Sequence, residues 1–256
     1  MPRRPQIRSL LAFTGLLLVA CPGPKTVEAP RPAAPAPIEA TLVIRGVHVF
    51  DGEARVGPTS VAVAGDAIVA VGPDLAVTGG AAEIDGAGMT LLPGLIDAHT
   101  HIQSADQLRQ ALEFGVTTEL DMFSLPSFTG PLRKIAGGRA GRSLADFRSA
   151  GILATAPGGH GTEYGMAIPT LTGPDQAAAF VDARLAEGSD YVKIVLDDGH
   201  AFDRALPTLA PDTVRALIAA AHARGKLAVV HVSSQREAVA AVEAGADGLV
   251  HVFFDT

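Results

Sequence analysis

Apolar residues between positions 41 and 92 form short runs that are separated by turn-forming residues. The runs cover residues 42–44, 47–50 and 60–64, and Asp51-Gly52 and Gly57-Pro58 lie between them. Gly65-Asp66 separates the apolar residues 61–63 from a further run at 68–71, which indicates a two-residue hairpin turn. We therefore expect a small sheet-rich unit over residues 41–92, the N-terminal β-sandwich part of the protein.

The pattern changes to alternating helices and strands after residue 100. Helical spacing of apolar residues occurs at 106–114, 177–187, 213–224 and 235–244, and each segment is followed by a glycine and a short apolar run. The glycine provides the left-handed residue that ends a helix. With further strands at 95–101 and 150–155, the sequence predicts six strands and about six βα units of a parallel sheet over residues 93–256.

The first of these strands has two histidines at its C-terminal end. An apolar run opens with Pro93-Gly94 and closes with His99 and His101. Residues i and i+2 of a strand share a face with Cα atoms about 6–7 Å apart, so both imidazoles could bind one metal ion. A His-x-His pair also occurs by chance, and alone it fits ordinary strand-end histidines equally well.

Similar side chains recur at the ends of later strands. Lys193 lies in the predicted fourth strand, His231 closes the fifth and His251 closes the sixth. The C-terminal ends of parallel strands in a barrel converge on one mouth, so the sequence predicts one metal site there. An alternative for Lys193 is burial as an ion pair with Asp197 or Asp198.

The run from Pro93 to His101, followed along the chain by Lys193, His231 and His251, resembles the amidohydrolase superfamily. Its members are metal-dependent hydrolases with a distorted (β/α) barrel and a small β-sandwich. The resemblance covers the chain from about residue 41 and implies an α/β fold, an incomplete (β/α)8 TIM-like barrel preceded by that sandwich. It implies two divalent metal ions, with zinc the expected metal, and a small-molecule substrate. His99 and His101 would bind one ion, His231 and His251 the other, and a carboxylated Lys193 would bridge them.

The chemistry of the expected site follows from these residue types. Lys193 stands among Val192, Ile194 and Val195, and burial favours the neutral amine that can add carbon dioxide. Two cations about 3.5–4 Å apart lower the pKa of a shared water and make hydroxide available as a nucleophile. The resemblance thus implies hydrolysis of C–N bonds in cyclic amides or dipeptides.

The chain departs from the family at its C-terminal end. The superfamily's aspartate at the end of strand eight has no counterpart, and Asp255 follows the sixth strand too closely to replace it, so no catalytic residue is identified. We expect a fragment, or the product of a truncated reading frame, of a longer protein. Two alternatives stay open: a catalytically inactive surface lipoprotein that retains a metal or ligand pocket, and a one-metal, deaminase-type site without carboxylated lysine.

A glycine-rich loop at 157–165 follows the predicted third strand. It resembles the loop of the imidazolonepropionase-like and Xaa-Pro dipeptidase-like branches, which makes His160 and Tyr164 candidate substrate contacts. A loop whose glycines only form turns is the alternative. We expect His48, His200 and His222 to be structural, and the basic residues from Arg133 to Arg148 to cover a solvated face.

The N-terminal region has the features of an exported lipoprotein. Arg3, Arg4 and Arg8 precede an apolar stretch at 10–20, which is too short to span a bilayer. It leads into Cys21, the only cysteine, in a lipobox-like context that predicts a signal peptide over residues 1–21 and lipidation. An ordinary secretory signal is the alternative. Residues 22–40 are rich in proline and alanine and should form an extended linker.

Composition narrows the choice of partners. The chain of 256 residues has a net charge of −7, no tryptophan and no basic cluster, so a nucleic-acid partner is not expected. The lipid anchor would instead hold the protein at a membrane, on the periplasmic or cell-surface side. The sequence leaves assembly into a homo-oligomer open.

Overall fold

The computed structural model describes residues 36–136 and 143–255, which form two compact units. The first unit comprises the described residues up to Val49 together with Val56–Thr90, and the second comprises Phe50–Arg55 and the described residues from Leu91 onward. The predicted signal peptide, Cys21 and most of the proline-rich linker lie outside the described residues. None of the helices in the described part is long and apolar enough to cross a membrane.

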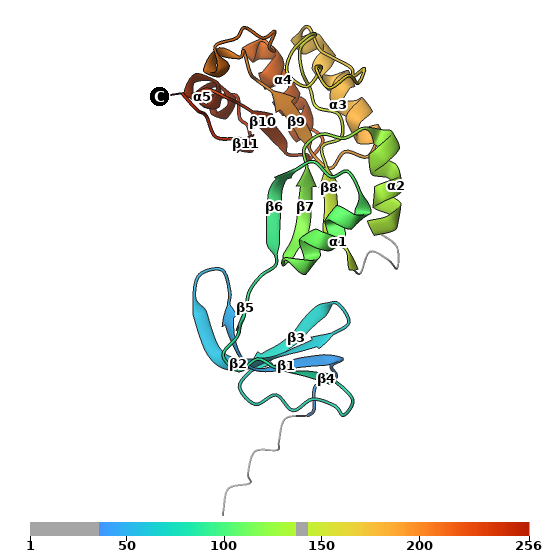
Figure 1. Cartoon of the computed structure of the whole chain (residues 1–256), viewed down its shortest axis with the longest axis vertical. Coiled ribbons are helices and arrows are strands. Elements are labelled where there is room, and N and C mark those ends of the chain that lie inside the picture. Colours follow the sequence, from blue (N-terminus) through green and yellow to red (C-terminus); the bar gives the residue numbers. More distant parts are fainter. Residues whose placement is uncertain (1–35, 137–142, 256) are drawn as a thin grey trace, which may run out of the picture. The chain divides into compact units, whose positions relative to one another are not determined.

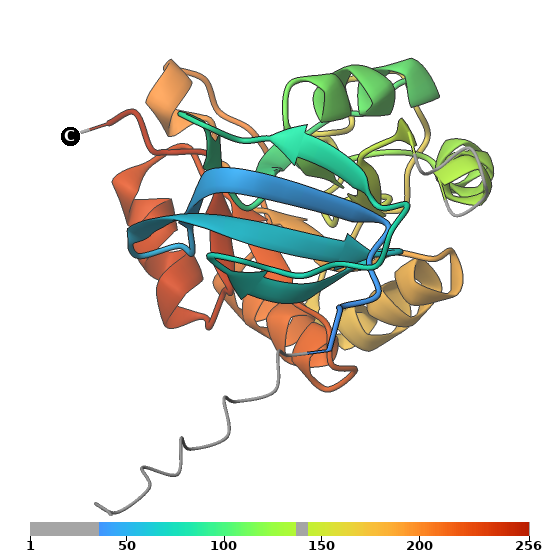
Figure 2. The same cartoon turned by 90° about the horizontal axis from the view of Figure 1, so that it is seen from below.

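The described residues of the first unit form one five-stranded sheet (Figures 1 and 2). Its strands are β1 (Leu42–Phe50), β2 (Arg55–Ala64), β3 (Ala67–Gly72), β4 (Ala82–Asp85) and β5 (Thr90–Leu91). The order is β3-β2-β1-β4, with β5 paired to β1. The predicted hairpin is confirmed, because β2 and β3 are antiparallel and Gly65 takes a φ of 63° in the turn between them. A second sheet that would complete a sandwich is not among the described residues.

The described residues of the second unit form six parallel strands. They are β6 (Leu95–Thr100), β7 (Val116–Asp121), β8 (Asp146–Ser149), β9 (Val192–Val195), β10 (Ala228–His231) and β11 (Gly248–Val250). Two three-stranded sheets, β6-β7-β8 and β9-β10-β11, are joined at Ala154, which pairs with Ile194 of β9. Neighbouring strands therefore follow one another in chain order, as expected for successive βα units.

The third strand lies earlier than the sequence predicted. The strand is formed by Asp146–Ser149, and residues 150–155 contribute only the isolated pairing of Ala154. Gly151 adopts a φ of 66°, which interrupts the extended backbone of this segment. The side chains of residues 150–155 are nevertheless buried, so the hydrophobicity of this run reflects burial without a regular strand.

All four predicted helices are present. They are α1 (Ala105–Glu113), α3 (Ala177–Ala186), α4 (Pro211–His222) and α5 (Gln235–Glu243). The glycine after each helix has a positive φ, as the pattern required: Gly115, Gly188, Gly225 and Gly245. The sequence did not predict helix α2 (Pro126–Ala136), because Pro131 lies inside it and Gly130 precedes that proline.

Arg133 on α2 corrects the expectation of a solvated basic face. Its guanidinium donates to Asp190 at 2.7 Å and lies 5.5 Å from the ring centroid of Phe147, so the side chain is largely buried. Arg148 is more exposed and pairs with Asp146 at 2.9 Å. Arg133 therefore ties α2 to the segment that precedes β9.

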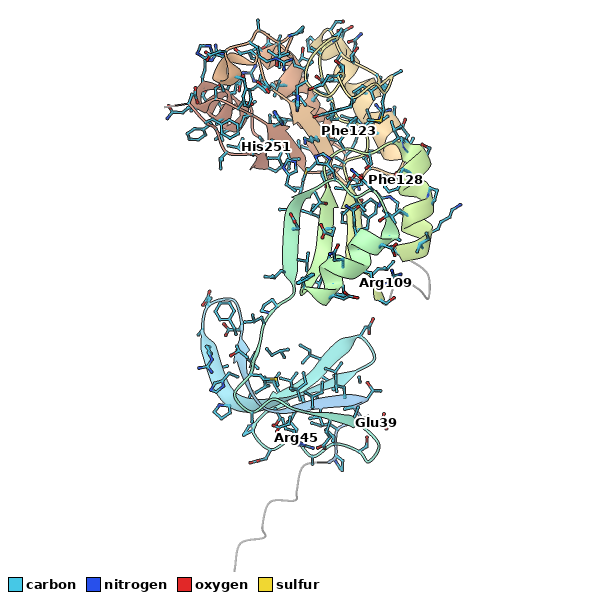
Figure 3. All side chains as sticks on the ribbon, in the orientation of Figure 1. Glu39, Arg45, Arg109, Phe123, Phe128 and His251 are labelled. Carbon is cyan, nitrogen blue, oxygen red and sulfur yellow. The ribbon has the colours of Figure 1, made fainter. Side chains whose placement is uncertain are left out.

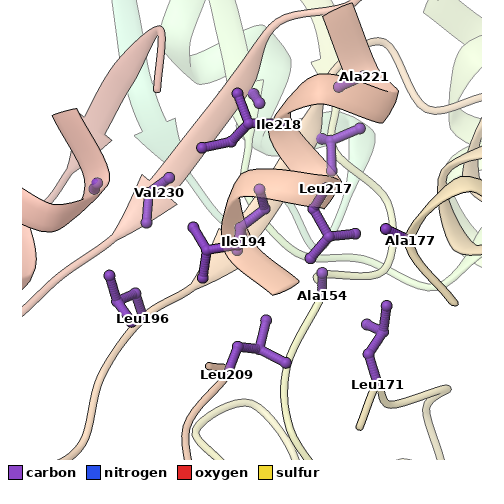
Figure 4. Packing of buried hydrophobic residues seen from close by; sticks show 14 of the residues in the cluster. Ala154, Leu171, Ala177, Ile194, Leu196, Leu209, Leu217, Ile218, Ala221 and Val230 are labelled. Carbon is purple, nitrogen blue, oxygen red and sulfur yellow. The ribbon is translucent and has the colours of Figure 1, made fainter. Parts of the chain in front are cut away.

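The largest hydrophobic core lies beneath strands β9 and β10. Ile194, Val230, Leu217 and Ile218 are at most 2% exposed and pack together between these strands and α4 (Figure 4). Burial of such side chains contributes roughly 1.5–3 kcal/mol each. The core fixes the two strands that carry Lys193 and His231.

Candidate metal centre

Four histidines from three strands meet in the second unit. Ring centroids lie 4.3 Å apart for His99 and His251, 4.5 Å for His231 and His251, and 5.5 Å for His99 and His101. An imidazole nitrogen lies about 2.0–2.1 Å from a bound metal, so rings that share one ion have centroids roughly 4–5.5 Å apart. The spacing of these rings suits nitrogen ligation of metal ions.

His251 has an unusual backbone conformation. It follows β11 directly and adopts a φ of 106°, which an L-residue with a side chain rarely takes. Such a conformation costs on the order of 1–3 kcal/mol and is concentrated at functional sites. The strained turn places the imidazole of His251 beside the rings of His99 and His231.

Lys193 is buried in β9. Its side chain is 3% exposed, and desolvation lowers its pKa from 10.5 to about 8, against the opposing charge of Asp121. Within the described residues no ion pair joins Lys193 to Asp197 or Asp198, which was the alternative for a buried lysine. Burial therefore makes the neutral amine accessible near physiological pH.

His231 presents one ring nitrogen without a partner. Its Nε2 atom lies 3.3 Å from Oδ2 of Asp197, whereas its Nδ1 atom is buried and has no hydrogen bond. A carboxylate only accepts hydrogen bonds, so we assign the proton of the neutral ring to Nε2. The lone pair of Nδ1 is then free, and a buried nitrogen in this state fits a metal ligand.

The electrostatics of the cluster favour neutral imidazoles. Burial, followed by the nearby charges of Lys193 and His251, lowers the pKa of His99 to about 4. Burial and the neighbouring His160 and His251 lower the pKa of His231 to about 3. Metal ligation requires deprotonated imidazole, so the donor set fits a divalent cation.

Asp121 is a buried carboxylate of this region that the sequence analysis missed. It ends β7 with 0% exposure and accepts hydrogen bonds from the Ser149 hydroxyl at 2.5 Å, the Ser124 hydroxyl at 2.9 Å and the Ile102 N–H at 3.1 Å. Burial raises the pKa of Asp121, and the negative charge of Asp121 raises the pKa of Lys193. Its position at a strand end, like that of His101, was the signal that could have found it.

The two candidate substrate contacts lie beside the histidines. The ring of His160 is 4.6 Å from that of His231 and 6.0 Å from that of Tyr164, measured between centroids. The Nδ1 atom of His160 is 2.6 Å from Oε1 of Glu163, which orients the imidazole. The loop approaches the backbone of Pro207 closely at Gly159, where a Cβ would lie 2.6 Å from the carbonyl oxygen of Pro207.

A second group of acidic side chains is engaged in structural hydrogen bonds. Carboxylate oxygens of Asp197, Asp198 and Glu237 lie within 4.8 Å of one another. Glu237 accepts from the N–H groups of Ser233, Ser234 and Asp198, which caps the start of α5 and fixes the loop after β9. These bonds explain the buried carboxylate of Glu237 without a metal ion.

The histidines expected to be structural lie elsewhere. His222 pairs with Asp247 at 2.8 Å at the end of α4, and His48 belongs to β1 of the first unit. His200 opens a short 3-10 turn at His200–Phe202, where its N–H donates to Asp198. They are not part of the cluster of His99, His101, His231 and His251.

The family of the chain follows from comparison with known proteins. Residues 90–255 match the model of the amidohydrolase family, so the protein belongs to that family. The match spans β6 to β11 and includes every histidine of the cluster. The hydrolase class, its general use of divalent metals and a mixed α/β fold are properties of this family.

Solved structures share the fold, and curated proteins share part of the sequence. A Xaa-Pro dipeptidase with bound methionine superposes with a TM-score of 0.68 at 22% identity, covering 81% of this chain and 60% of that protein. The A. niger ochratoxinase superposes with a TM-score of 0.67 at 17% identity, covering 82% of this chain and 60% of that protein. An Escherichia coli (strain SMS-3-5 / SECEC) allantoinase is 36% identical over 91 residues, 32% of this chain and 19% of that enzyme. The chain thus spans less than two thirds of the length of these relatives.

Proposed function

We propose that the protein is a metal-dependent hydrolase of C–N bonds in cyclic amides or dipeptides. The observation that carries the proposal is the meeting of four imidazoles and one buried amine from β6, β9, β10 and β11. Names of relatives, including a Xaa-Pro dipeptidase and an allantoinase, agree with C–N hydrolysis. The second unit would be six βα units of a (β/α)8 barrel, and the first unit its β-sandwich part.

The residues of the cluster have distinct roles in this proposal. His99 and His101 would hold one divalent ion, and His231 and His251 a second, with zinc the metal that suits these nitrogen donors. Lys193 would bridge the pair as a carbamate. When bound, the ions would supply a water of lowered pKa as the nucleophile and polarise the scissile carbonyl.

Formation of the carbamate depends on the environment of Lys193. The neutral amine nitrogen attacks the carbon of carbon dioxide, a C–N bond forms, and one N–H proton leaves to solvent. Because burial lowers the pKa of Lys193 to about 8, a substantial fraction of the amine is neutral near pH 7.5. The nearby carboxylate of Asp121 opposes this effect, and its three hydrogen bonds hold it in place.

His160 and Tyr164 would hold the substrate. Both side chains line a cavity of about 470 Å³ together with His231 and His251, so a group bound there lies beside the proposed metal ligands. The Nε2 atom of His160 is available for the substrate because Nδ1 is engaged by Glu163. The phenol of Tyr164 can donate or accept a hydrogen bond.

We also propose that the protein is an exported lipoprotein. The support is in the sequence, where Arg3, Arg4 and Arg8 precede an apolar stretch and the single cysteine Cys21. Lipidation at Cys21 would anchor the protein to a membrane through the proline-rich linker. Radiolabelled palmitate incorporation into the wild type and its loss in Cys21→Ser would test this point.

The hydrolase proposal can be tested with the whole protein, stripped of metal and reloaded with zinc. We expect release of a free amine from dipeptides, N-acyl amino acids or cyclic amides, and loss of that activity by more than about 100-fold in His231→Asn. His222→Asn, remote from the cluster, is the matched control. Two bound ions without turnover of any substrate in the panel would favour an inactive lipoprotein, and one ion per chain would favour the one-metal site.

A further inference from the structure

A cavity of about 600 Å³ lies beside His101. Its walls come from the residues that follow β6 and β7, from the first turn of α2, and from the loop that carries Tyr164. The apolar wall is formed by Ile102, Phe123, Leu125, Phe128, Tyr164 and Met166. Figure 3 shows Phe123 and Phe128 close together near the end of β7 and the start of α2.

The floor of this cavity is buried and apolar. Phe123 is 8% exposed and packs on Ile152, Leu153 and Val195. Its ring centroid lies 6.0 Å from that of Tyr164, so two aromatic rings face the same space. Among the wall residues that the structure describes, His101 is the only acidic or basic side chain.

The neighbouring cavity, which holds His160 and His231, has a different character. It is lined by Glu163, Asp197 and Arg204 in addition to the histidines. An apolar group placed there would desolvate charged side chains, which is costly, whereas in the cavity beside His101 it would displace water from apolar surface. Tyr164 lines both cavities, so one substrate could reach from one into the other.

We infer that the cavity beside His101 binds an aromatic or branched aliphatic group of the substrate, adjacent to the C–N bond that is cleaved. The inference rests on the proposed hydrolase function and names its substrate class: amides with a bulky apolar substituent. Cavities of about 300–1,000 Å³ lined by apolar and aromatic side chains are typical of ligand sites. Burial of one such group should improve binding by roughly 10- to 100-fold.

Binding can be separated from hydrolysis by using the whole protein without metal. The probes are N-acetyl-L-phenylalanine amide and N-acetylglycine amide, which differ only by a benzyl group, and their dissociation constants are measured by ligand-observed NMR titration. Ser127→Trp should fill the cavity from an exposed wall position, and Phe128→Ala should remove part of the wall. Phe114→Ala is the control, because Phe114 is 75% exposed at the end of α1 and does not line the cavity.

We expect the wild type and Phe114→Ala to bind the benzyl probe at least about 10-fold more tightly than the glycine probe. Both cavity variants should reduce that ratio several-fold. Equal binding of the two probes by the wild type, or an unchanged ratio in both variants, would overturn the inference. Turnover by the zinc-loaded protein is scored separately, so a benzyl preference without turnover favours the inactive lipoprotein over the hydrolase and leaves the apolar subsite standing.

Discussion

The Nε2 atom of His231 lies 3.3 Å from Oδ2 of Asp197, and both side chains are less than a tenth exposed. The other oxygen of Asp197 accepts the N–H of Gly199 at 2.8 Å, so the carboxylate is fixed to the loop after β9. Asp197 therefore sets both the orientation of the imidazole and which of its nitrogens carries the proton. A carboxylate that accepts a hydrogen bond from a metal-ligating histidine commonly fixes the tautomer and orientation of the ring and raises its basicity as a ligand.

Replacement of that carboxylate should weaken metal binding without removing a ligand. In Asp197→Asn the amide can turn its NH₂ group toward His231, which would place the ring proton on Nδ1 and occupy the nitrogen that is now free. We expect zinc affinity, measured by competition with a chromophoric chelator, to fall about 10- to 100-fold.

A neighbouring carboxylate provides the control for this prediction. Asp198 is next in the chain but bonds to the side chain of Arg236 and to the N–H of His200 rather than to His231. Asp198→Asn should leave zinc affinity within about 2-fold of the wild type. Equal losses in the two variants would show that general negative charge, and not the contact with His231, supports the site.

Lys193 should be required for a two-ion site. We predict that Lys193→Ala binds about one ion per chain instead of about two, because the bridging oxygen ligand is lost. Metal content is measured by inductively coupled plasma mass spectrometry. Protein equilibrated with ¹³C-bicarbonate should give a carbamate carbon signal by NMR in the wild type and none in the variant. Two ions in Lys193→Ala would exclude the bridging role.

Much of the second unit could be predicted from local patterns. Helices α1, α4 and α5 have amphipathic sequences, and all four predicted helices, α3 included, have a glycine after the last turn. Helix α2 could not be predicted in this way, since Pro131 forbids one internal hydrogen bond and the compensating contacts of Leu132 and Arg133 are tertiary. The strand expected at 150–155 is interrupted at Gly151, whose positive φ the sequence does not reveal.

The candidate site was partly predictable for a similar reason. Side chains at the C-terminal ends of parallel strands share one end of the sheet, so the meeting of His99, His231 and His251 followed from topology. Their role as metal ligands stays a prediction. Asp121 and Asp197 were not assigned to the site, because their contacts with Ser149 and His231 join segments that no sequence pattern links.

The core beneath β9 and β10 should dominate the stability of the second unit. Leu217 on α4 is 0% exposed, whereas Leu227, just before β10, is 60% exposed. We predict that Leu217→Ala lowers the free energy of unfolding by about 2–5 kcal/mol, and that the same change at Leu227 costs less than about 1 kcal/mol. Urea unfolding followed by circular dichroism measures both; equal costs would contradict the burial argument.

Asp247 should make stability depend on pH in the acidic range. A hydrogen bond from the N–H of Ala228 at 2.7 Å, and then the contact with His222, lower its pKa below 3.8. A carboxylate whose pKa is lower in the folded state stabilises the protein above its unfolded pKa, and the contribution is lost as pH falls through the folded pKa. The stability difference between wild type and Asp247→Asn should therefore be present at about pH 5 and decline below about pH 4 in urea titrations. A difference that grows on acidification would contradict this sign.

His160 should act on the substrate and not on the metal. Its ring lies 4.6 Å from that of His231, close enough for either role, but its Nδ1 atom is engaged by Glu163 at 2.6 Å. We predict that His160→Ala keeps the metal content of the wild type, while kcat/KM falls about 10- to 150-fold through loss of one hydrogen bond to the substrate. Metal analysis and steady-state kinetics on the same preparation measure the two quantities.

The histidine at position 200 supplies the matched control for this prediction. It lies in a short turn, outside the cavity that holds His160, and His200→Ala should change neither metal content nor kcat/KM by more than about 2-fold. Glu163→Gln should give a smaller loss than His160→Ala, because the amide oxygen can still accept a hydrogen bond from Nδ1. If His160→Ala instead lost one ion per chain, His160 would be a metal ligand, and the division between metal-binding strand ends and a substrate-binding loop would be wrong.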